Sequence, residues 1–246
     1  MNKQHSLIIG GTRGIGRALV KLFSAAGHTV SIIGRRAPVE ADTKIPGVRH
    51  WIVDLLEQDQ LHRTLAEVIQ HNGKLNNLVF LQRYRGQGDN WSGEIATSLT
   101  ATQQIIERVA KDFDGGGAIV LVSSIIGQFV VPGQPVSYHV AKAGLDHLMR
   151  YYAVALGPQG IRVNGVSPAS VIKEESKEFY SKNEKLRDLF QKIVPLGRIG
   201  TAEEVAHVIE FLCDSKAAFV TGQNIVVDGG LTLQSQESLT RGLAGL

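Results

Sequence analysis

Short apolar runs alternate with segments of helical spacing along almost the whole chain, and this alternation is what most constrains the fold. The apolar runs predict strands at residues 6–10, 29–33, 48–53, 78–81, 118–123, 161–166 and 224–227. The helical periodicity predicts helices at residues 14–26, 57–71, 92–112, 138–156 and 202–212. Continuous apolar strands are typical of a sheet buried on both faces, so the repeated strand–helix–strand order indicates an α/β fold with a doubly wound parallel sheet.

No linker or internal repeat divides the 246 residues, so a single domain is expected over residues 1–246. Residues 170–192 depart from the alternation because they are rich in charge and lie between a strand and a proline. One interpretation is a solvated pair of helices with charges spaced i,i+4. A lid over a substrate site is the favoured interpretation, since it is a long insertion after the C-terminal end of a strand.

The composition excludes several functional classes. The net charge is only +3, and Lys and Arg form no run of five or six, so nucleic-acid binding is not indicated. Cys213 is the single cysteine, which excludes a disulfide within the chain and predicts a reducing compartment, with Cys213 in the core. No apolar run approaches the ~18 residues of a membrane span, and the polar N-terminus does not read as a signal peptide. We therefore expect a cytoplasmic protein with no membrane partner.

A glycine-rich turn, GGTRGIG at residues 10–16, joins the first expected strand to the first helix. Glycines let the backbone turn sharply and bring amide groups close to a pyrophosphate, and the helix N-terminus adds a favourable dipole. The spacing differs from the general GxGxxG fingerprint, and a purely structural turn is the alternative. Its place at the first strand-to-helix junction favours nucleotide binding. The residues expected to contact the cofactor here are Gly10, Thr12, Arg13, Gly14, Ile15 and Gly16.

Arg35 and Arg36 follow the second expected strand, where an acidic residue would bind the ribose 2′-hydroxyl of NAD(H). Arginine suits a 2′-phosphate instead, so NADP(H) is predicted in preference to NAD(H), although ordinary surface charges are the alternative. Asp54 and Leu55 follow the third strand. The Asp54 carboxylate either receives an adenine amine or caps the next helix.

Tyr138 and Lys142 lie four residues apart at the start of an expected helix, which places both side chains on one face. A free phenol has a pKa of about 10, and a nearby ammonium group would lower the pKa of Tyr138 toward the operating pH. Ser124 ends the preceding strand, at the sheet edge where ligands bind in open α/β folds. Its hydroxyl can hold a carbonyl group while Tyr138 protonates it.

Together these motifs resemble those of the short-chain dehydrogenase/reductase family, in particular its 3-oxoacyl-[acyl-carrier-protein] reductase-like members. The resemblance covers nearly the whole chain and continues through residues 161–164, 195–198, 222–223 and 227–230. It implies a single Rossmann-type domain that transfers hydride between NADP(H) and a small-molecule carbonyl or alcohol. It also implies a homo-oligomer, tetramer or dimer, paired through the two long helices. The tail at residues 231–246 is longer than is usual in the family, and we expect it to pack on a neighbouring subunit.

The resemblance further implies a role for each matching residue. Ser124 would polarise the carbonyl and Tyr138 would act as the general acid/base. Lys142 would lower the tyrosine pKa and hold the nicotinamide ribose. Asp54 and Leu55 would contact adenine, and Val171 would add a further cofactor contact.

Three positions depart from the family pattern. Residues 80–83 read FLQR where the family has Asn-Asn-Ala-Gly, and Arg83 and Arg85 bring positive charge close to the site. Ser98 aligns with the catalytic asparagine that anchors a water in the proton relay, so Ser98 is a candidate catalytic residue in an altered relay. Lys173 stands where a threonine is expected. The changes at residues 80–83 and at Ser98 support a second hypothesis, a regulatory protein that binds or senses the cofactor with little turnover.

Overall fold

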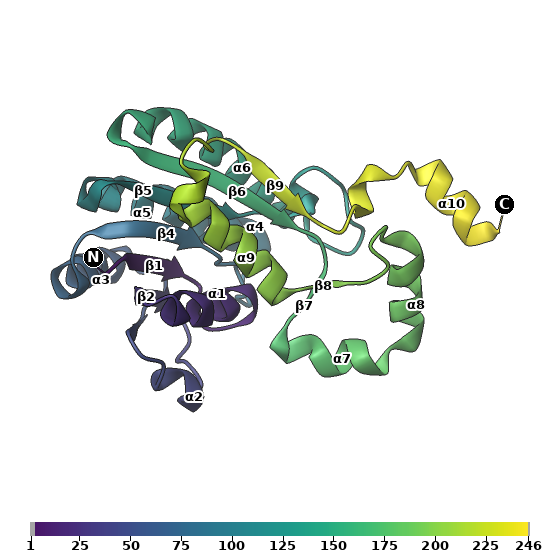
Figure 1. Ribbon diagram of the computed structural model, residues 1–246, viewed down its shortest axis with the longest axis horizontal. Helices are drawn as coiled ribbons and strands as arrows, with labels where there is room; N and C mark the ends of the chain where they lie inside the picture. Colours follow the sequence, from purple (N-terminus) through teal and green to yellow (C-terminus); the bar gives the residue numbers. More distant parts are fainter. Residues whose placement is uncertain (1–2, 246) are drawn as a thin grey trace.

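The computed structural model describes residues 3–245, and it contains a seven-stranded sheet in which all strands are parallel (Figure 1). The strands are β1 (His5–Ile9), β2 (Thr29–Gly34), β3 (Val48–Ile52), β4 (Leu75–Phe80), β5 (Phe113–Val122), β6 (Ile161–Pro168) and β9 (Asn224–Val227). Their spatial order is β3-β2-β1-β4-β5-β6-β9, so the winding direction reverses between β1 and β4. Such a reversal point is where open α/β sheets bind ligands, beyond the carboxyl ends of the strands.

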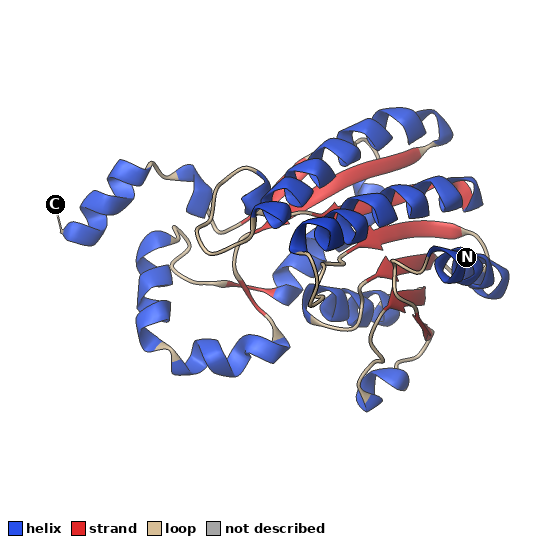
Figure 2. Ribbon diagram, turned by 180° about the vertical axis from the view of Figure 1, so that it is seen from behind, coloured by secondary structure: helices blue, strands red, loops and turns tan. Residues whose placement is uncertain are grey.

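Helices cover both faces of the sheet, as the sequence predicted (Figure 2). One face is covered by α1 (Gly14–Ala25) and α9 (Ala202–Cys213). The other is covered by α3 (Gln58–Asn72), α5 (Ala101–Val109) and α6 (Val136–Leu156).

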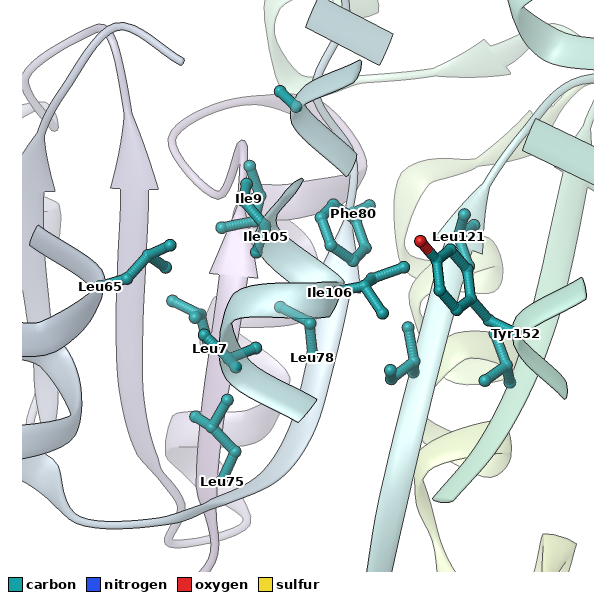
Figure 3. Packing of buried hydrophobic residues seen from close by; sticks show 14 of the residues in the cluster. Leu7, Ile9, Leu65, Leu75, Leu78, Phe80, Ile105, Ile106, Leu121 and Tyr152 are labelled. Carbon is teal, nitrogen blue, oxygen red and sulfur yellow. The ribbon is translucent and has the colours of Figure 1, made fainter. Parts of the chain in front are cut away.

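Alternation along β1 shows how one strand serves two cores. Ile8 belongs to the cluster with α1 and α9, whereas Leu7 and Ile9 belong to the cluster with α3, α5 and α6 (Figure 3). All three side chains are fully buried. A strand buried on both faces has no need of polar positions, which explains its continuous apolar sequence. Cys213 is also buried, as expected, and burial raises the pKa of its thiol to about 12.

The structure does not contain the single helix that was expected at residues 92–112. The structure divides this stretch into α4 (Asn90–Glu94), the π-helix η1 (Ile95–Thr100), α5 and the 3₁₀ turn η2 (Ala110–Asp112). Asp89 begins it, with its carboxylate accepting the backbone N–H groups of Trp91 and Ser92. Helical periodicity does not reveal a π insertion, which is typically found at functional sites.

The start of β5 also differs from the expected position. The strand was expected at residues 118–123, but β5 already begins at Phe113, so the three glycines at residues 115–117 lie within it. A Cβ atom on Gly117 would come within 2.5 Å of the Asn76 carbonyl oxygen. The glycines therefore permit close packing of β5 against its neighbour, where the register between β4 and β5 shifts.

A second layer of structure stands beyond the carboxyl ends of the strands (Figure 1). It contains the two-stranded sheet of β7 (Val171–Ile172) and β8 (Gly200–Thr201). It also contains three short helices between these two strands and two near the C-terminus. These helices are η5 (Glu174–Ser176), α7 (Lys177–Lys182), α8 (Glu184–Ile193), η7 (Leu231–Leu233) and α10 (Gln236–Ala244). The remaining short elements are α2 (Glu40–Thr43), η3 (Ile125–Gly127), η4 (Gly157–Gln159) and η6 (Ser215–Ala217). Among residues 3–245, no helix has the length and apolar character needed to cross a membrane.

Candidate active site

A cavity of about 620 Å³ lies where the strands end, between the main sheet and the start of the second layer. Every residue expected to bind the cofactor lines it, including Val171 from β7. Ser124, Tyr138 and Lys142 line the same cavity, while Ser98 lies outside its lining. The sequence motifs that were spaced over more than 130 residues therefore converge on one space.

The glycine turn forms one wall of this cavity. Gly10 and Gly14 adopt φ angles of +93° and +52°, a conformation that favours glycine. A Cβ atom on Gly16 would lie 2.3 Å from the Gly10 carbonyl oxygen, so no side chain fits there. The turn brings bare backbone to the N-terminus of α1, which is the geometry that suits a dinucleotide phosphate.

Arg35 and Asp54 lie together on the neighbouring wall. The Arg35 Nη1 is 3.7 Å from Asp54 Oδ2, and Arg35 Nη2 donates to the carbonyl oxygen of Arg85 at 3.1 Å. The other Asp54 oxygen accepts the Leu56 N–H at 3.1 Å. Glu57 is the N-cap residue of α3, so the interpretation of Asp54 as the helix cap is wrong, and its contact with adenine stays a prediction.

Tyr138 and Lys142 share one face of α6, as their spacing predicted. The Lys142 Nζ lies 5.5 Å from the centre of the Tyr138 ring and donates to the Val122 carbonyl oxygen at 2.9 Å. The hydroxyl of Ser123 donates to the Lys142 carbonyl oxygen at 2.9 Å, which ties α6 to the end of β5. Ser124 is the next residue, and its backbone turn places the buried hydroxyl near Pro168.

The ionisation of Tyr138 differs from the expectation. Burial raises the pKa of Tyr138 above its ordinary value, and the charge of Glu94 acts in the same direction. The charges of Arg83 and Arg85 oppose this rise in the Tyr138 pKa, with the Arg83 guanidinium 4.0 Å from the ring centre. The expected net lowering is therefore wrong for this state of the site. Burial also lowers the pKa of Lys142 to about 8, because the residue is only 4% exposed.

Ser98 is fully buried in η1, where its hydroxyl donates to the carboxylate of Glu94 one turn earlier. Sequence reasoning missed Glu94. The signal that could have revealed it is the i,i+4 spacing of a carboxylate and a serine on a helix otherwise facing the core.

Two further cavity-lining residues, Lys173 and Glu175, come from the start of the 170–192 segment. Glu175 Oε1 accepts the Gly14 N–H at 3.0 Å, and the Lys173 stem packs over Gly14. The neighbouring Glu174 pairs with Arg17 and Lys21 on α1. These contacts are tertiary, and nothing in the local sequence indicates them.

Among the described residues, no group of three or more His, Cys, Asp or Glu side chains could hold a metal ion.

Known proteins that resemble this chain include reductases and other oxidoreductases. A family model described as enoyl-(acyl carrier protein) reductase matches residues 10–232. An uncharacterized oxidoreductase of Schizosaccharomyces pombe is 33% identical over 239 residues, which cover 92% of this chain and 89% of that protein. The 3-oxoacyl-[acyl-carrier-protein] reductase of Thermotoga maritima is 33% identical over 245 residues, covering 92% and 97%. A solved structure titled ElxO with NADP bound is 25% identical, with a TM-score of 0.81 and coverage of 94% and 100%.

Proposed function

The chain belongs to the short-chain dehydrogenase/reductase family, and on that premise we propose that it is an NADP(H)-dependent enzyme interconverting a carbonyl compound and an alcohol. One observation carries the proposal. Ser124, Tyr138 and Lys142 line the same cavity as the glycine turn, so a bound dinucleotide and a carbonyl group would share one space.

The residues present fit the proposed cofactor. The backbone cradle of Gly10, Gly14 and Gly16 excludes side chains and presents amide groups, as a pyrophosphate requires. Arg35 and Arg36 line the cavity near the end of β2, where a 2′-phosphate would be recognised. When bound, the nicotinamide would supply or accept the hydride. The bound NADP of one structural relative supports the same cofactor for this chain.

The protein's own groups would then manage the proton. Ser124 would donate a hydrogen bond to the carbonyl oxygen and hold it beside Tyr138. Tyr138 would give its phenolic proton to the developing alkoxide, or take the alcohol proton in the reverse direction. Lys142 would stabilise the resulting phenolate with its ammonium group and would also hold the nicotinamide ribose.

Replacement of Ser124 tests the substrate-holding role. Cofactor oxidation would be measured with NADPH and a panel of ketones and 3-oxoacyl thioesters. Ser124→Ala should lower kcat/KM by about 100-fold, the usual effect of losing one donor to a developing oxyanion. Ser215→Ala, at an exposed serine of η6, is the matched control and should leave the rate unchanged. Equal rates in Ser124→Ala and Ser215→Ala would contradict the role.

Titration with NADPH and NADH tests the cofactor preference. Arg35→Ala and Arg36→Ala should weaken NADPH binding and leave NADH binding nearly unchanged, because only NADPH has the 2′-phosphate. Arg63→Ala removes an exposed charge of α3 outside the cavity and serves as the control. A preference for NADPH that survives both arginine substitutions would show that the 2′-phosphate site lies elsewhere.

The same proposal extends to the setting of the enzyme. We propose that residues 170–192 close over the substrate, since their start already contacts the glycine turn. We also propose that the enzyme works in the cytoplasm as a homo-oligomer, consistent with its single buried cysteine and with exposed apolar residues on α6.

A further inference from the structure

Glu94 is a buried carboxylate next to the candidate catalytic residues. Glu94 is the last residue of α4, which continues directly into the π-helix η1. The residue is only 4% exposed. The Ser98 hydroxyl, fully buried, donates a hydrogen bond to it. A buried carboxylate is costly unless it is hydrogen-bonded and faces a positive charge, so its surroundings should supply a cation.

The helix packed against this carboxylate is α6, which contains a buried lysine. Both α4 and η1 pack against α6, the helix that contains Tyr138 and Lys142. After burial itself, the charge of Glu94 has the largest effect on the pKa of Lys142, and it raises that pKa. The other charges facing Lys142 are Arg83, from the loop after β4, and Asp146, one turn along α6.

Ser98 occupies the position where the family resemblance expects an asparagine. A serine is too short to take over the hydrogen-bonding reach of an asparagine side chain, and it offers one donor. In this chain the Ser98 hydroxyl donates its hydrogen bond to the Glu94 carboxylate. The pair therefore places a carboxylate in the segment that packs against α6, where the family pattern has a neutral amide.

We propose that Glu94, held by Ser98, is a positioning residue that keeps Lys142 in its ammonium form beside Tyr138. This inference deepens the proposed function, because it concerns how the same catalytic set is kept ready. Glu94 acts through Lys142 and is assigned no contact with the substrate or the cofactor.

The proposal has a directional consequence for two groups. Without the Glu94 charge, Lys142 should lose its proton at lower pH, since an ammonium group in a buried site is left with less compensation. Tyr138 should also ionise at lower pH, because the Glu94 charge now raises its pKa against the opposing Arg83 and Arg85 charges and the Ser124 hydroxyl. The pKa values of Lys142 and Tyr138 should therefore both fall, and the two shifts can be told apart by following each group directly.

The test follows Lys142 by NMR in cofactor-free protein labelled with ¹³C at lysine Cε, with Lys142→Met assigning the signal. In the wild type the midpoint should lie near the pKa of about 8. In Glu94→Gln the midpoint should fall by roughly one pH unit, the lower end of the effect of one opposite charge. Glu107→Gln, an exposed carboxylate on α5, is the matched control and should leave the midpoint unchanged.

Two further variants guard against a folding defect in Glu94→Gln. Glu94→Asp keeps the charge and should restore most of the wild-type midpoint. Ser98→Ala removes only the hydroxyl, and it should lower the Lys142 midpoint by a smaller amount because the carboxylate loses its donor. An unchanged Lys142 midpoint in folded Glu94→Gln, or in Ser98→Ala where Glu94→Gln does not fold, would overturn the proposal.

The titration needs no turnover, so its result is independent of the proposed reaction. Where turnover is observed, the basic limb of the pH profile of kcat should move to lower pH in Glu94→Gln and stay in place in Glu107→Gln. Absence of turnover in the wild type would contradict the proposed function and leave the NMR result to decide the role of Glu94.

Discussion

At the scale of single residues, the site is governed by burial as much as by charge. The sequence pattern assigns the tuning of Tyr138 to Lys142, but Lys142 is itself buried, which lowers its pKa to about 8. Its ammonium group is still mostly charged at pH 7, but it loses its proton at a lower pH than an ordinary lysine does. The strongest opposing charge on Tyr138 is Arg83, whose guanidinium lies over the ring. Tyr138 is therefore neutral at pH 7 in this state and holds the proton that carbonyl reduction requires.

The low pKa of Lys142 predicts proton uptake on cofactor binding. At pH 9, above its pKa of about 8, Lys142 is mostly neutral in the cofactor-free protein. The phosphates of NADPH bring negative charge into the cavity, which favours the ammonium form and raises the lysine pKa. Binding should thus take up a proton at pH 9 and much less at pH 6.5, where Lys142 is already charged.

Calorimetric titration in two buffers of different ionisation enthalpy measures this uptake. Lys142→Met should abolish it, while Lys21→Met, at an exposed lysine of α1, should not. Identical proton uptake at pH 9 in wild type and Lys142→Met would show that another group titrates.

At the scale of elements, the start of the 170–192 segment is held on the glycine turn by three consecutive residues. Lys173 packs over Gly14, Glu174 pairs with Arg17, and Glu175 accepts the Gly14 N–H. That N–H is the group expected to face the cofactor pyrophosphate. A carboxylate of the chain itself therefore occupies the anion position at the N-terminus of α1, and it must leave when the cofactor binds.

Removal of the Glu175 charge should tighten NADPH binding. Glu175→Gln is expected to lower the Kd about two- to five-fold, corresponding to the 0.3–1 kcal/mol typical of a charge at a helix N-terminus. Glu178→Gln, at an exposed residue of α7, is the control. Fluorescence titration provides the measurement, and a Kd that is equal or higher in Glu175→Gln would mean that the carboxylate does not compete with the cofactor.

Much of the fold and part of the site could be predicted from the sequence, for a physical reason. Strands buried on both faces and helices with one apolar face have periodic patterns, so the seven strands of the main sheet and the helices over them were anticipated. The glycine turn and the Tyr138–Lys142 pair are short local motifs, so they could be recognised in the sequence itself. The Glu175 contact depends on packing between distant segments, which leaves no period in the sequence. Helical periodicity does not distinguish the π-helix from an α-helix, and the i,i+4 spacing of Glu94 and Ser98 does not show that they lie against α6.

At the scale of the whole molecule, α6 has an outer face with an apolar stripe. Val136, Val140, Tyr151 and Val154 are exposed, with Val154 79% exposed. At 100° per residue these four positions lie within about 60° of one another, so they form a single stripe. The inner face of the same helix contributes to the core and to the cavity, so assembly through this stripe would brace the element that holds Tyr138 and Lys142.

Charge introduced into this stripe should prevent assembly. Tyr151→Glu combined with Val154→Glu is expected to convert a homo-oligomer into a monomer, because two carboxylates would be desolvated in the apolar contact. Sedimentation velocity on both proteins gives the mass, and Lys216→Glu, on η6, is the control. A wild-type protein that sediments as a monomer at micromolar concentration would contradict the predicted interface.

Tyr138 is the proposed proton donor of a reaction in which hydride comes from NADPH. The direct measurement follows deuterium from NADPH labelled at nicotinamide C4 into the product by mass spectrometry, in wild type and in Tyr138→Phe. Tyr151→Phe, on the same helix but exposed, is the matched control. We predict labelled alcohol from the wild type and Tyr151→Phe, and a rate at least about 100-fold lower in Tyr138→Phe, the low end of general acid catalysis. Label transfer at equal rates in wild type and Tyr138→Phe, or no transfer to any carbonyl of the panel, would contradict the account.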